Sequence, residues 1–301
     1  LRAVAIAAGL ASPEALENAA DGTPDDGVVA PGIAEARAAG RLILVAEDDE
    51  INQKVILRQL ALLGYTAELV GTGSEALRLW RQGNYAMLLT DLHMPEMDGY
   101  TLAASIRREE AAGRRMPILA LTANALRGEA HRAHAAGMDE YLTKPIQLSQ
   151  LGSALEKWLP RSDQPVAAAV PAPPREPEAG HRIVDIEVLR GLVGGNTADL
   201  GRLLGVYQAS LHTAREELGV ARNADDMRGI AAVAHKLKSS SRAVGALALG
   251  DICAELENAC RSGEPTVVAE GCQKFTDALA DVEVCIAGLL NAPAEGLRGA
   301  A

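Results

Sequence analysis

The chain has 301 residues, which suggests about two domains, and its hydrophobic fraction of 48% is that of a packed globular protein. Aromatic residues make up 3% of the chain, so its cores must be built from Leu, Ile, Val and Ala. A net charge of −11 argues against a broad nucleic-acid-binding surface, and no apolar run approaches the roughly 20 residues that span a bilayer.

Residues 1–40 open the chain without a sustained apolar period, and from residue 13 they are rich in Ala, Gly, Pro, Asp and Glu. We interpret them as a linker or as the end of a missing upstream domain, because Leu1 is not a Met and suggests a fragment of a longer chain. The Ala-rich start is short and no convincing cleavage site follows it, which argues against a signal peptide.

Residues 41–160 alternate between short apolar runs and helical stretches, which indicates a doubly wound α/β domain. The five runs are LILVAE, TAELV, AMLLTD, ILALTA and the weaker DEYLT. They predict a five-stranded parallel sheet that helices cover on both faces. The first helical stretch, at about residues 50–63, carries one apolar stripe, which comprises Ile51, Val55, Ile56, Leu60 and Leu63.

The C-terminal part of the chain has a different character. Residues 161–180 contain five prolines and predict an extended, semi-rigid linker that lets two domains meet and separate. Residues 181–290 carry no strand signal, and their four or five amphipathic helices predict an all-α four-helix-bundle domain. The expected breaks lie near Gly194–Gly195, Asn223, Gly245 and Gly263–Pro265. Residues 291–301 are expected to form a flexible tail.

Acidic residues end two of the predicted strands: Glu47, Asp48 and Asp49 follow the first, and Asp91 ends the third. Ligands of open parallel sheets bind beyond the carboxyl ends of the strands, so a strand order of 2-1-3-4-5 would bring these acids together. Three carboxylates in one pocket raise one another's pKa, and a Mg²⁺ ion relieves that repulsion. A carboxylate held by Mg²⁺ can attack a phosphoryl group and form an acyl phosphate.

Two further residues at strand ends can bind phosphoryl oxygens. Thr122 ends the fourth predicted strand and offers a hydroxyl, while Lys144 follows the fifth and offers an ammonium group. Each acid taken alone is compatible with an ordinary loop residue or helix cap. The five-part pattern in this strand order argues against coincidence.

The segments ILVAEDDEINQKVILRQLALLGY, LLTDLHMPEMDGY, LALTAN and YLTKPI resemble a response-regulator receiver domain of the kind found in hybrid sensor kinases. The resemblance covers about residues 41–159 and implies that Asp91 is the phosphoacceptor. The implied Mg²⁺ ligands are Glu47, Asp48, Asp91 and the backbone carbonyl of His93, whose imidazole need not be catalytic.

The same resemblance assigns roles to residues late in the domain. Thr122 and Lys144 are implied to contact the phosphoryl group, and Pro145 to follow a peptide bond that is commonly cis in the family. Tyr141 matches the aromatic switch position; the alternative is a simple half-buried strand residue.

His235 lies in a helical segment at residues 225–246. At about 100° per residue the apolar side chains form one stripe, and His235 falls well off it. The stripe comprises Ile230, Val233, Ala234, Leu237 and Val244, and the residues on the side of His235 are Arg228, Lys238, Ser239 and Arg242. We therefore predict an exposed histidine in a basic patch, able to act as a nucleophile and to attract an acidic partner face. The alternative is a surface histidine without function.

The segment AHKLKSSSRAVGA, with the LE pair that follows at residues 256–257, resembles the histidine phosphotransfer domain, and the match covers about residues 183–290. It implies that His235 is phosphorylated and that Lys238 is its supporting cation, with Ser239 where many family members have Gly. The remaining histidines without a motif are expected at the surface: His131, His134, His181 and His212. The four cysteines are expected to be reduced core residues: Cys253, Cys260, Cys272 and Cys285.

The combination predicts two-component phosphorelay signalling, with Mg²⁺-dependent phosphoryl acceptance on Asp91 and transfer through His235 to or from a downstream response regulator. The sequence carries no dimerising kinase helix, Gly-rich ATP lid or Asn box, so we expect phosphotransfer activity only. The chain resembles the C-terminal part of a hybrid sensor histidine kinase. The expected partners are an upstream kinase core, in the same or a separate chain, and a downstream receiver domain. The expected location is the cytoplasm, or the cytosolic part of a membrane-anchored hybrid kinase.

Two other interpretations stay open at this point. In the first, the chain belongs to a full kinase whose catalytic part precedes Leu1. In the second, the receiver is a docking module controlled by phosphorylation and His235 is silent.

Overall fold

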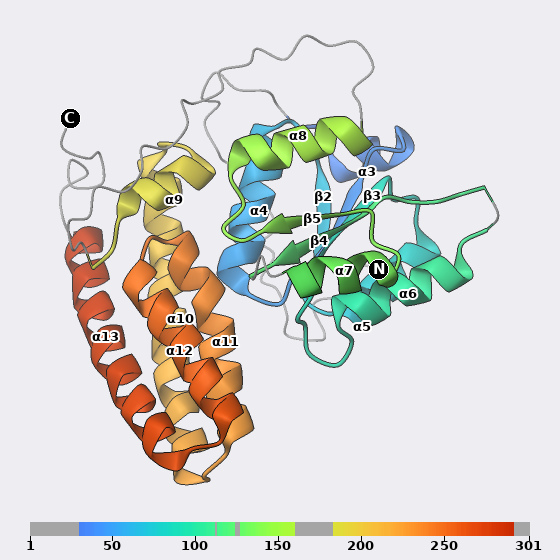
Figure 1. Ribbon diagram of the computed structural model, residues 1–301. Coiled ribbons are helices and arrows are strands. Elements are labelled where there is room, and N and C mark those ends of the chain that lie inside the picture. Colours follow the sequence, from blue (N-terminus) through green and yellow to red (C-terminus); the bar gives the residue numbers. More distant parts are fainter. Residues whose placement is uncertain (1–29, 112, 124–126, 160–182, 292–301) are drawn as a thin grey trace, which may run out of the picture.

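The structure is a computed structural model that describes residues 30–111, 113–123, 127–159 and 183–291. A five-stranded sheet with helices on both faces lies beside a bundle of helices (Figure 1). The strands are β1 (Ile43–Ala46), β2 (Ala67–Val70), β3 (Met87–Asp91), β4 (Ile118–Thr122) and β5 (Glu140–Thr143). The helices of the sheet domain are α3 (Ile33–Ala38), α4 (Glu50–Leu62), α5 (Gly73–Gln82), α6 (Gly99–Glu109), α7 (Arg127–Ala135) and α8 (Leu148–Trp158). Those of the bundle are α9 (Ile186–Val193), α10 (Thr197–Asn223), α11 (Met227–Ala243), α12 (Leu247–Ser262) and α13 (Pro265–Asn291).

The strands pair in parallel in the order β2-β1-β3-β4-β5, which confirms the predicted doubly wound sheet. In the register of the central pair, Val45 of β1 lies beside Leu89 of β3. Because all the strands run the same way, the carboxyl ends of β1 and β3 are neighbours at one edge of the sheet.

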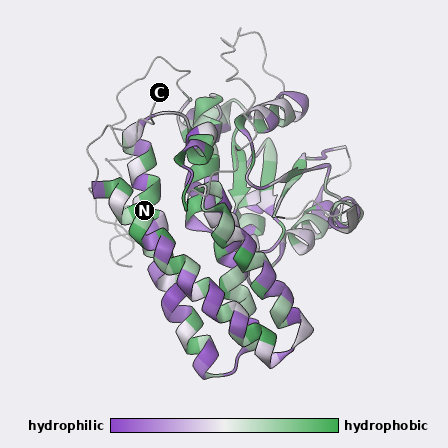
Figure 2. Cartoon of the chain, turned by 60° about the vertical axis from the view of Figure 1, so that its left-hand side comes forward, coloured by the Kyte–Doolittle hydropathy of each residue, from purple (hydrophilic) through white to green (hydrophobic). Residues whose placement is uncertain are grey.

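Two hydrophobic layers sandwich the sheet, since successive side chains of a strand point to opposite faces. Leu44 and Leu88 pack with residues of α5 and α6 on one face. Ile43 and Leu89 pack with residues of α4 and α8 on the other. Figure 2 shows these strands as mostly hydrophobic segments between helices whose outer faces are hydrophilic.

The bundle has its own core, and side-chain caps begin three of its helices. Asp185, Asn196 and Asp226 accept hydrogen bonds from backbone N–H groups in the first turns of α9, α10 and α11. Tyr207 and Phe275 are fully buried between the helices, and the Tyr207 hydroxyl pairs with that of Ser241 at 2.6 Å. The predicted helical domain is therefore confirmed, with breaks at the expected places.

The break after α11 depends on glycine. Gly245 has a φ of +87°, and a Cβ on it would lie 2.0 Å from the backbone oxygen of Asp185. The backbone of Asp185 in turn donates a hydrogen bond to the Gly245 carbonyl at 3.0 Å. A side chain at residue 245 would therefore push the start of α9 away from the end of α11.

Helix α4 carries two apolar faces, where the sequence predicted one stripe. Ile56 and Leu60 pack on the sheet as expected. Ile51 and Val55 instead belong to the hydrophobic cluster of the bundle, with 0% and 7% of their surface exposed. The two domains therefore share a continuous apolar contact through α4 (Figure 1).

Residues 30–40, part of the predicted linker, contain helix α3, which packs on the sheet domain. Arg37 donates to Glu68 of β2 at 2.5 Å, and the Thr66 hydroxyl donates to the Pro31 carbonyl. The rest of that linker, the linker at 161–180 and residues 292–301 of the predicted tail lie outside the described residues. In the part of the chain that the structure covers, no helix is long and apolar enough to cross a bilayer.

Candidate functional site

The carboxylates predicted to converge at the sheet edge do so. Glu47 and Asp48 follow β1 and Asp91 ends β3, and these three residues form what we call the acid cluster. One carboxylate oxygen from each lies within 4.8 Å of the others. Glu47 is 1% exposed and Asp91 is 8% exposed, while Asp48 is half-buried. The parallel order of β1 and β3 is what brings together acids that stand more than forty residues apart in the chain.

The loop around the acid cluster is held by its own hydrogen bonds. Asp49 caps α4 by accepting from the Asn52 backbone N–H at 2.9 Å, and the Asn52 amide donates to Glu47 at 3.2 Å. The His93 backbone N–H donates to Asp91 at 3.0 Å. A Cβ at Gly99 would lie 2.2 Å from the Asp91 carbonyl oxygen, so a side chain at residue 99 would displace the backbone of Asp91. These contacts fix the direction of the carboxylates before any ligand binds.

Lys144 supplies the cation that the sequence placed here. Its ammonium group forms ion pairs with both Asp91 and Glu47, the latter at 2.6 Å, and its side chain is 5% exposed. The bond between Lys144 and Pro145 is cis, as the resemblance implies. Thr122, at the end of β4, donates its hydroxyl to Glu129 of α7 at 2.6 Å. The structure thus brings Lys144 onto the acid cluster and gives the Thr122 hydroxyl a carboxylate partner that the sequence did not predict.

Burial and neighbouring charges shift the pKa values of the three acids in different directions. Burial raises the pKa of Glu47 to about 8, opposed by Lys144 and reinforced by Asp91. Burial likewise raises the pKa of Asp48, and the charge of Asp91 adds to the effect. For Asp91, burial is outweighed by the ammonium group of Lys144, which holds the pKa below its ordinary value. The lowered pKa of Asp91 favours its ionised carboxylate, the form that acts as a nucleophile.

The donor set of the acid cluster fits a small hard cation. Mg²⁺ binds carboxylate and carbonyl oxygens and keeps places for water or phosphate oxygens. Three carboxylates within one cation's reach, two of them with raised pKa values, form a site whose repulsion such an ion would relieve. The residues present therefore fit a magnesium site.

His235 lies on α11 with its imidazole fixed by an acid from the next helix. Its Nδ1 and a carboxylate oxygen of Glu257, on α12, are 2.5 Å apart, and the side chain of His235 is 35% exposed. Lys238 donates to the other oxygen of Glu257 at 2.5 Å. The hydrogen bonds from His235 and Lys238 outweigh burial and lower the pKa of Glu257 to about 2. An ionised Glu257 that accepts at Nδ1 leaves Nε2 of His235 with its lone pair for attack.

The predicted basic patch around His235 is correct only in part. Lys238 is 9% exposed and is neutralised by Glu257. Arg242 is half-buried and pairs with Asp251 at 2.8 Å, whereas Arg228 is exposed as expected. Winding a single helix places Lys238 beside His235 correctly, but it cannot show that α12 covers that side. The apolar stripe itself is confirmed: its members Ile230, Val233, Ala234, Leu237 and Val244 are all buried.

Glu257 belongs to the LE pair of the resemblance, but the sequence assigned it no role. It stands 22 residues after His235 in the chain. On α12 it follows the buried Leu256 in an otherwise amphipathic helix. A buried acid beside an apolar stripe needs a cationic partner, and the nearest motif with cations is that of His235 and Lys238.

The two sites face each other across the contact between the domains. The rings of His93, two residues after Asp91, and His235 lie edge to face, with their centroids 5.2 Å apart and their planes at 88°. The positive charge of a protonated His235 would also lower the pKa of Asp48, which shows that the histidine lies within electrostatic reach of the acid cluster. The imidazole of His93 therefore lines the junction, a place that sequence reasoning did not predict for it.

Tyr141 and the remaining histidines and cysteines add no second cluster within the described residues. Tyr141 on β5 is 46% exposed, an orientation open to either of its two interpretations. Among the other histidines that the structure describes, each is exposed, as predicted: His131, His134 and His212. The fourth, His181, lies outside the described residues. All four thiols are free, with Cys253 and Cys272 buried in the bundle and Cys260 and Cys285 half-buried.

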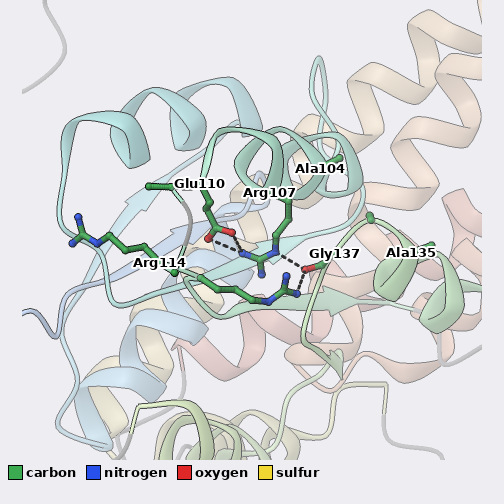
Figure 3. Close-up of a pocket in the computed structure, with 10 residues that line it drawn as sticks. Ala104, Arg107, Glu110, Arg114, Ala135 and Gly137 are labelled. Atoms are coloured by element: carbon green, nitrogen blue, oxygen red, sulfur yellow. Dashed lines mark hydrogen bonds and ion pairs between the residues drawn. The ribbon is translucent and has the colours of Figure 1, made fainter.

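A separate hollow of about 500 Å³ lies between α6 and α7 (Figure 3). Within this hollow, Arg107 donates to Glu110 at 2.8 Å and to the Gly137 carbonyl at 2.8 Å. Arg107 also pairs with Asp139 at 2.6 Å. Helices of a doubly wound fold run against the strands, so this network at the helix ends lies at the sheet edge opposite the acid cluster. Its closed pairing indicates a structural role.

Two family models match the chain. The response regulator receiver domain matches residues 43–156, and the Hpt domain matches residues 202–284. The sensor protein GacS of Pseudomonas syringae pv. syringae is 31% identical over 230 residues, which are 74% of this chain and 25% of the relative. The virulence sensor protein BvgS of Bordetella pertussis is 33% identical over 227 residues, 71% of this chain and 18% of the relative. The chain thus spans a quarter or less of the length of either protein.

Among solved structures, the receiver domain of the sensor histidine kinase PA1611 from Pseudomonas aeruginosa PAO1 is similar to part of the chain. It is 43% identical, with a TM-score of 0.37. The match covers 40% of this chain and 97% of that one.

Proposed function

Since this chain is a two-component phosphorelay protein that joins a receiver domain to an Hpt domain, we propose that Asp91 and His235 are its two phosphoryl carriers. One observation supports this assignment above the others: the acid cluster and His235 meet at the same junction, with the rings of His93 and His235 5.2 Å apart. Transfer between two carriers requires them to face each other in line, with little water between them.

In the first step, an ionised oxygen of Asp91 attacks the phosphorus of a donor, and the bond between phosphorus and the donor's leaving atom breaks. Glu47, Asp48, Asp91 and the His93 carbonyl would hold Mg²⁺, which when bound neutralises charge on the carboxylates and on the phosphoryl oxygens. Lys144 pairs with Asp91 and Glu47 in the resting state. Its ammonium group, with the hydroxyl of Thr122, then binds the phosphoryl oxygens of the aspartyl phosphate.

In the second step, Nε2 of His235 attacks the phosphorus, and the bond from phosphorus to the Asp91 oxygen breaks. The imidazole becomes positively charged as this bond forms, and the proton on Nδ1 stays hydrogen-bonded to Glu257. The ionised carboxylate therefore orients the ring and stabilises its developing charge. Lys238 neutralises the other oxygen of Glu257 and lies one helical turn from the histidine, which fits the supporting cation that the resemblance implies.

The partners follow from these roles. An upstream kinase core would phosphorylate Asp91, and a separate response-regulator receiver would exchange phosphate with His235. We place the chain in the cytosolic part of a hybrid sensor kinase, as its relatives are sensor proteins much longer than itself.

The test labels the whole chain with acetyl phosphate and Mg²⁺. The proposal expects an acyl phosphate on Asp91, absent from Asp91→Asn, and then an acid-labile, base-stable phosphate on His235, absent from His235→Gln. The His235→Gln chain should still carry the acyl phosphate. Label that stays on Asp91 in the wild-type chain, with none reaching His235, would refute the relay and leave the docking-module interpretation.

A further inference from the structure

Helix α4 of the receiver lies on the bundle face that carries His235. It contacts α9, α10 and α11. Ile51 and Val55 from the first half of α4 join the bundle's hydrophobic cluster, where they are almost completely buried. Burying two large aliphatic side chains against another domain removes apolar surface from water and so stabilises the contact between the domains.

A polar contact fixes the register of α4 on the bundle. Arg58, near the end of α4, forms an ion pair with Asp199 at 3.2 Å, and its Nε donates to the Val193 carbonyl at 3.4 Å. Asp199 lies in the first turn of α10, where Asn196 accepts a hydrogen bond from its backbone N–H. The Asp199 side chain is 17% exposed and that of Arg58 is 33% exposed, so part of their hydration has been lost. A like charge at either position would therefore weaken the docking of α4.

The docked receiver occupies the approach to the histidine. A hollow of about 310 Å³ between the domains is lined by Asp48 and Ile51 of the receiver and by Val233 and Lys236 of α11, the residues that flank His235. The ring of His93 on the receiver packs edge to face with the ring of His235. Another receiver that brought its own aspartate to His235 would need the space that α4 and His93 fill.

We propose that the chain's own receiver caps the bundle, so that a second receiver reaches His235 only after α4 has left the bundle. The ion pair between Arg58 and Asp199, which we call the latch, favours the chain's own receiver over other receivers. This inference rests on the proposed function, because His235 must carry phosphate for its shielding to matter. It adds an order of events. While the chain's own receiver is docked and loads phosphate onto His235, the same molecule cannot deliver that phosphate to another receiver.

A charge swap between two full-length copies tests the cap. The donor copy carries His235→Gln and is labelled on Asp91 with acetyl phosphate and Mg²⁺, then freed of both reagents. The acceptor copy carries Asp91→Asn and can take phosphate only on His235. In the first pair both latches are wild type. In the second pair the donor also carries Arg58→Asp and the acceptor also carries Asp199→Arg.

The swap opens both molecules and matches them to each other. Within each copy of the second pair, two like charges now meet at the latch, whereas the new carboxylate on the donor's receiver complements the new guanidinium group on the acceptor's bundle. We expect phosphohistidine to form at least about tenfold faster in the second pair than in the first. In a third pair, each copy carries both latch substitutions; its own latch is restored with reversed charges, and the rate should return to that of the first pair.

The outcomes separate the two claims. Equal rates in all three pairs, or a third pair as fast as the second, would overturn the cap. Absence of phosphohistidine in every pair and in the wild-type chain would overturn the proposed function, and the cap with it. A slow first pair, a fast second pair and a slow third pair would support the cap, and the fast second pair also shows that each substitution leaves its domain folded.

Discussion

Replacing Glu257 with glutamine removes the charge that faces Nδ1 of His235 and keeps the size of the side chain. In the wild-type chain one Glu257 oxygen lies 2.5 Å from Nδ1 and the other 2.5 Å from Lys238. The amide oxygen of glutamine can still accept one of these hydrogen bonds. It cannot balance the positive charge that His235 acquires when Nε2 attacks phosphorus.

The size of the effect follows from the kind of hydrogen bond that is lost. A hydrogen bond to a charged group contributes about 1.5–3 kcal/mol, against about 1 kcal/mol for a neutral pair. Each 1.36 kcal/mol of transition-state stabilisation is tenfold in rate. The difference of about 0.5–2 kcal/mol means that Glu257→Gln should slow the transfer from Asp91 to His235 by about 2- to 30-fold, and leave the loading of Asp91 by acetyl phosphate unchanged.

The assay follows one turnover: the chain is labelled on Asp91, excess donor is removed, and acid-labile phosphate on His235 is measured over time. The matched control is Glu255→Gln on the exposed side of α12, which should transfer at the wild-type rate. Nitrogen-15 chemical shifts of the His235 ring give an independent readout, since in the wild-type chain they should place the proton on Nδ1. A Glu257→Gln chain that transfers within twofold of wild type, with the same ring shifts, would refute the positioning role.

Three further expectations concern the metal, the core and pH. Removing Mg²⁺ with EDTA, or substituting Asp48→Asn, should reduce acetyl phosphate labelling of Asp91 at least about tenfold, and undiminished labelling would contradict the magnesium site. Phe275→Ala should lower the free energy of unfolding of the bundle by about 3–5 kcal/mol in urea titrations followed by circular dichroism, because this fully buried ring leaves a cavity; a loss below about 1 kcal/mol would contradict it. The pKa of Glu257 is lowered from 4.5 to about 2, so its contribution is complete above pH 4.5 and is lost as the pH falls towards 2. Wild type should exceed Glu257→Gln in free energy of unfolding by about 1–2 kcal/mol at pH 7, after allowance for solvent screening, and the difference should vanish near pH 2; a constant difference would contradict the linkage.

The sequence by itself determined the fold of the receiver and its candidate site. Short apolar runs identified the strands and helical spacing identified the helices, and acids at the ends of the first and third strands could converge only in a sheet where those strands are neighbours. Glu47 and Asp91 meet because the order of strands, a property of the whole repeat, fixes where each carboxyl end lies. The residue pattern of each strand and helix is local and repeats regularly, so it is visible in a single sequence.

Three features were decided by the tertiary structure alone. Ile51 and Ile56 both satisfied one helical stripe, yet one packs on the bundle and the other on the sheet. Lys238 was correctly placed beside His235, yet α12 brings Glu257 over it and cancels its charge. Periodicity records that a side chain is buried or exposed, but not which surface buries it, because that surface comes from residues distant in the chain. The surface that covers each helix face is formed only when the helices pack. The contact between His93 and His235 depends on the same packing.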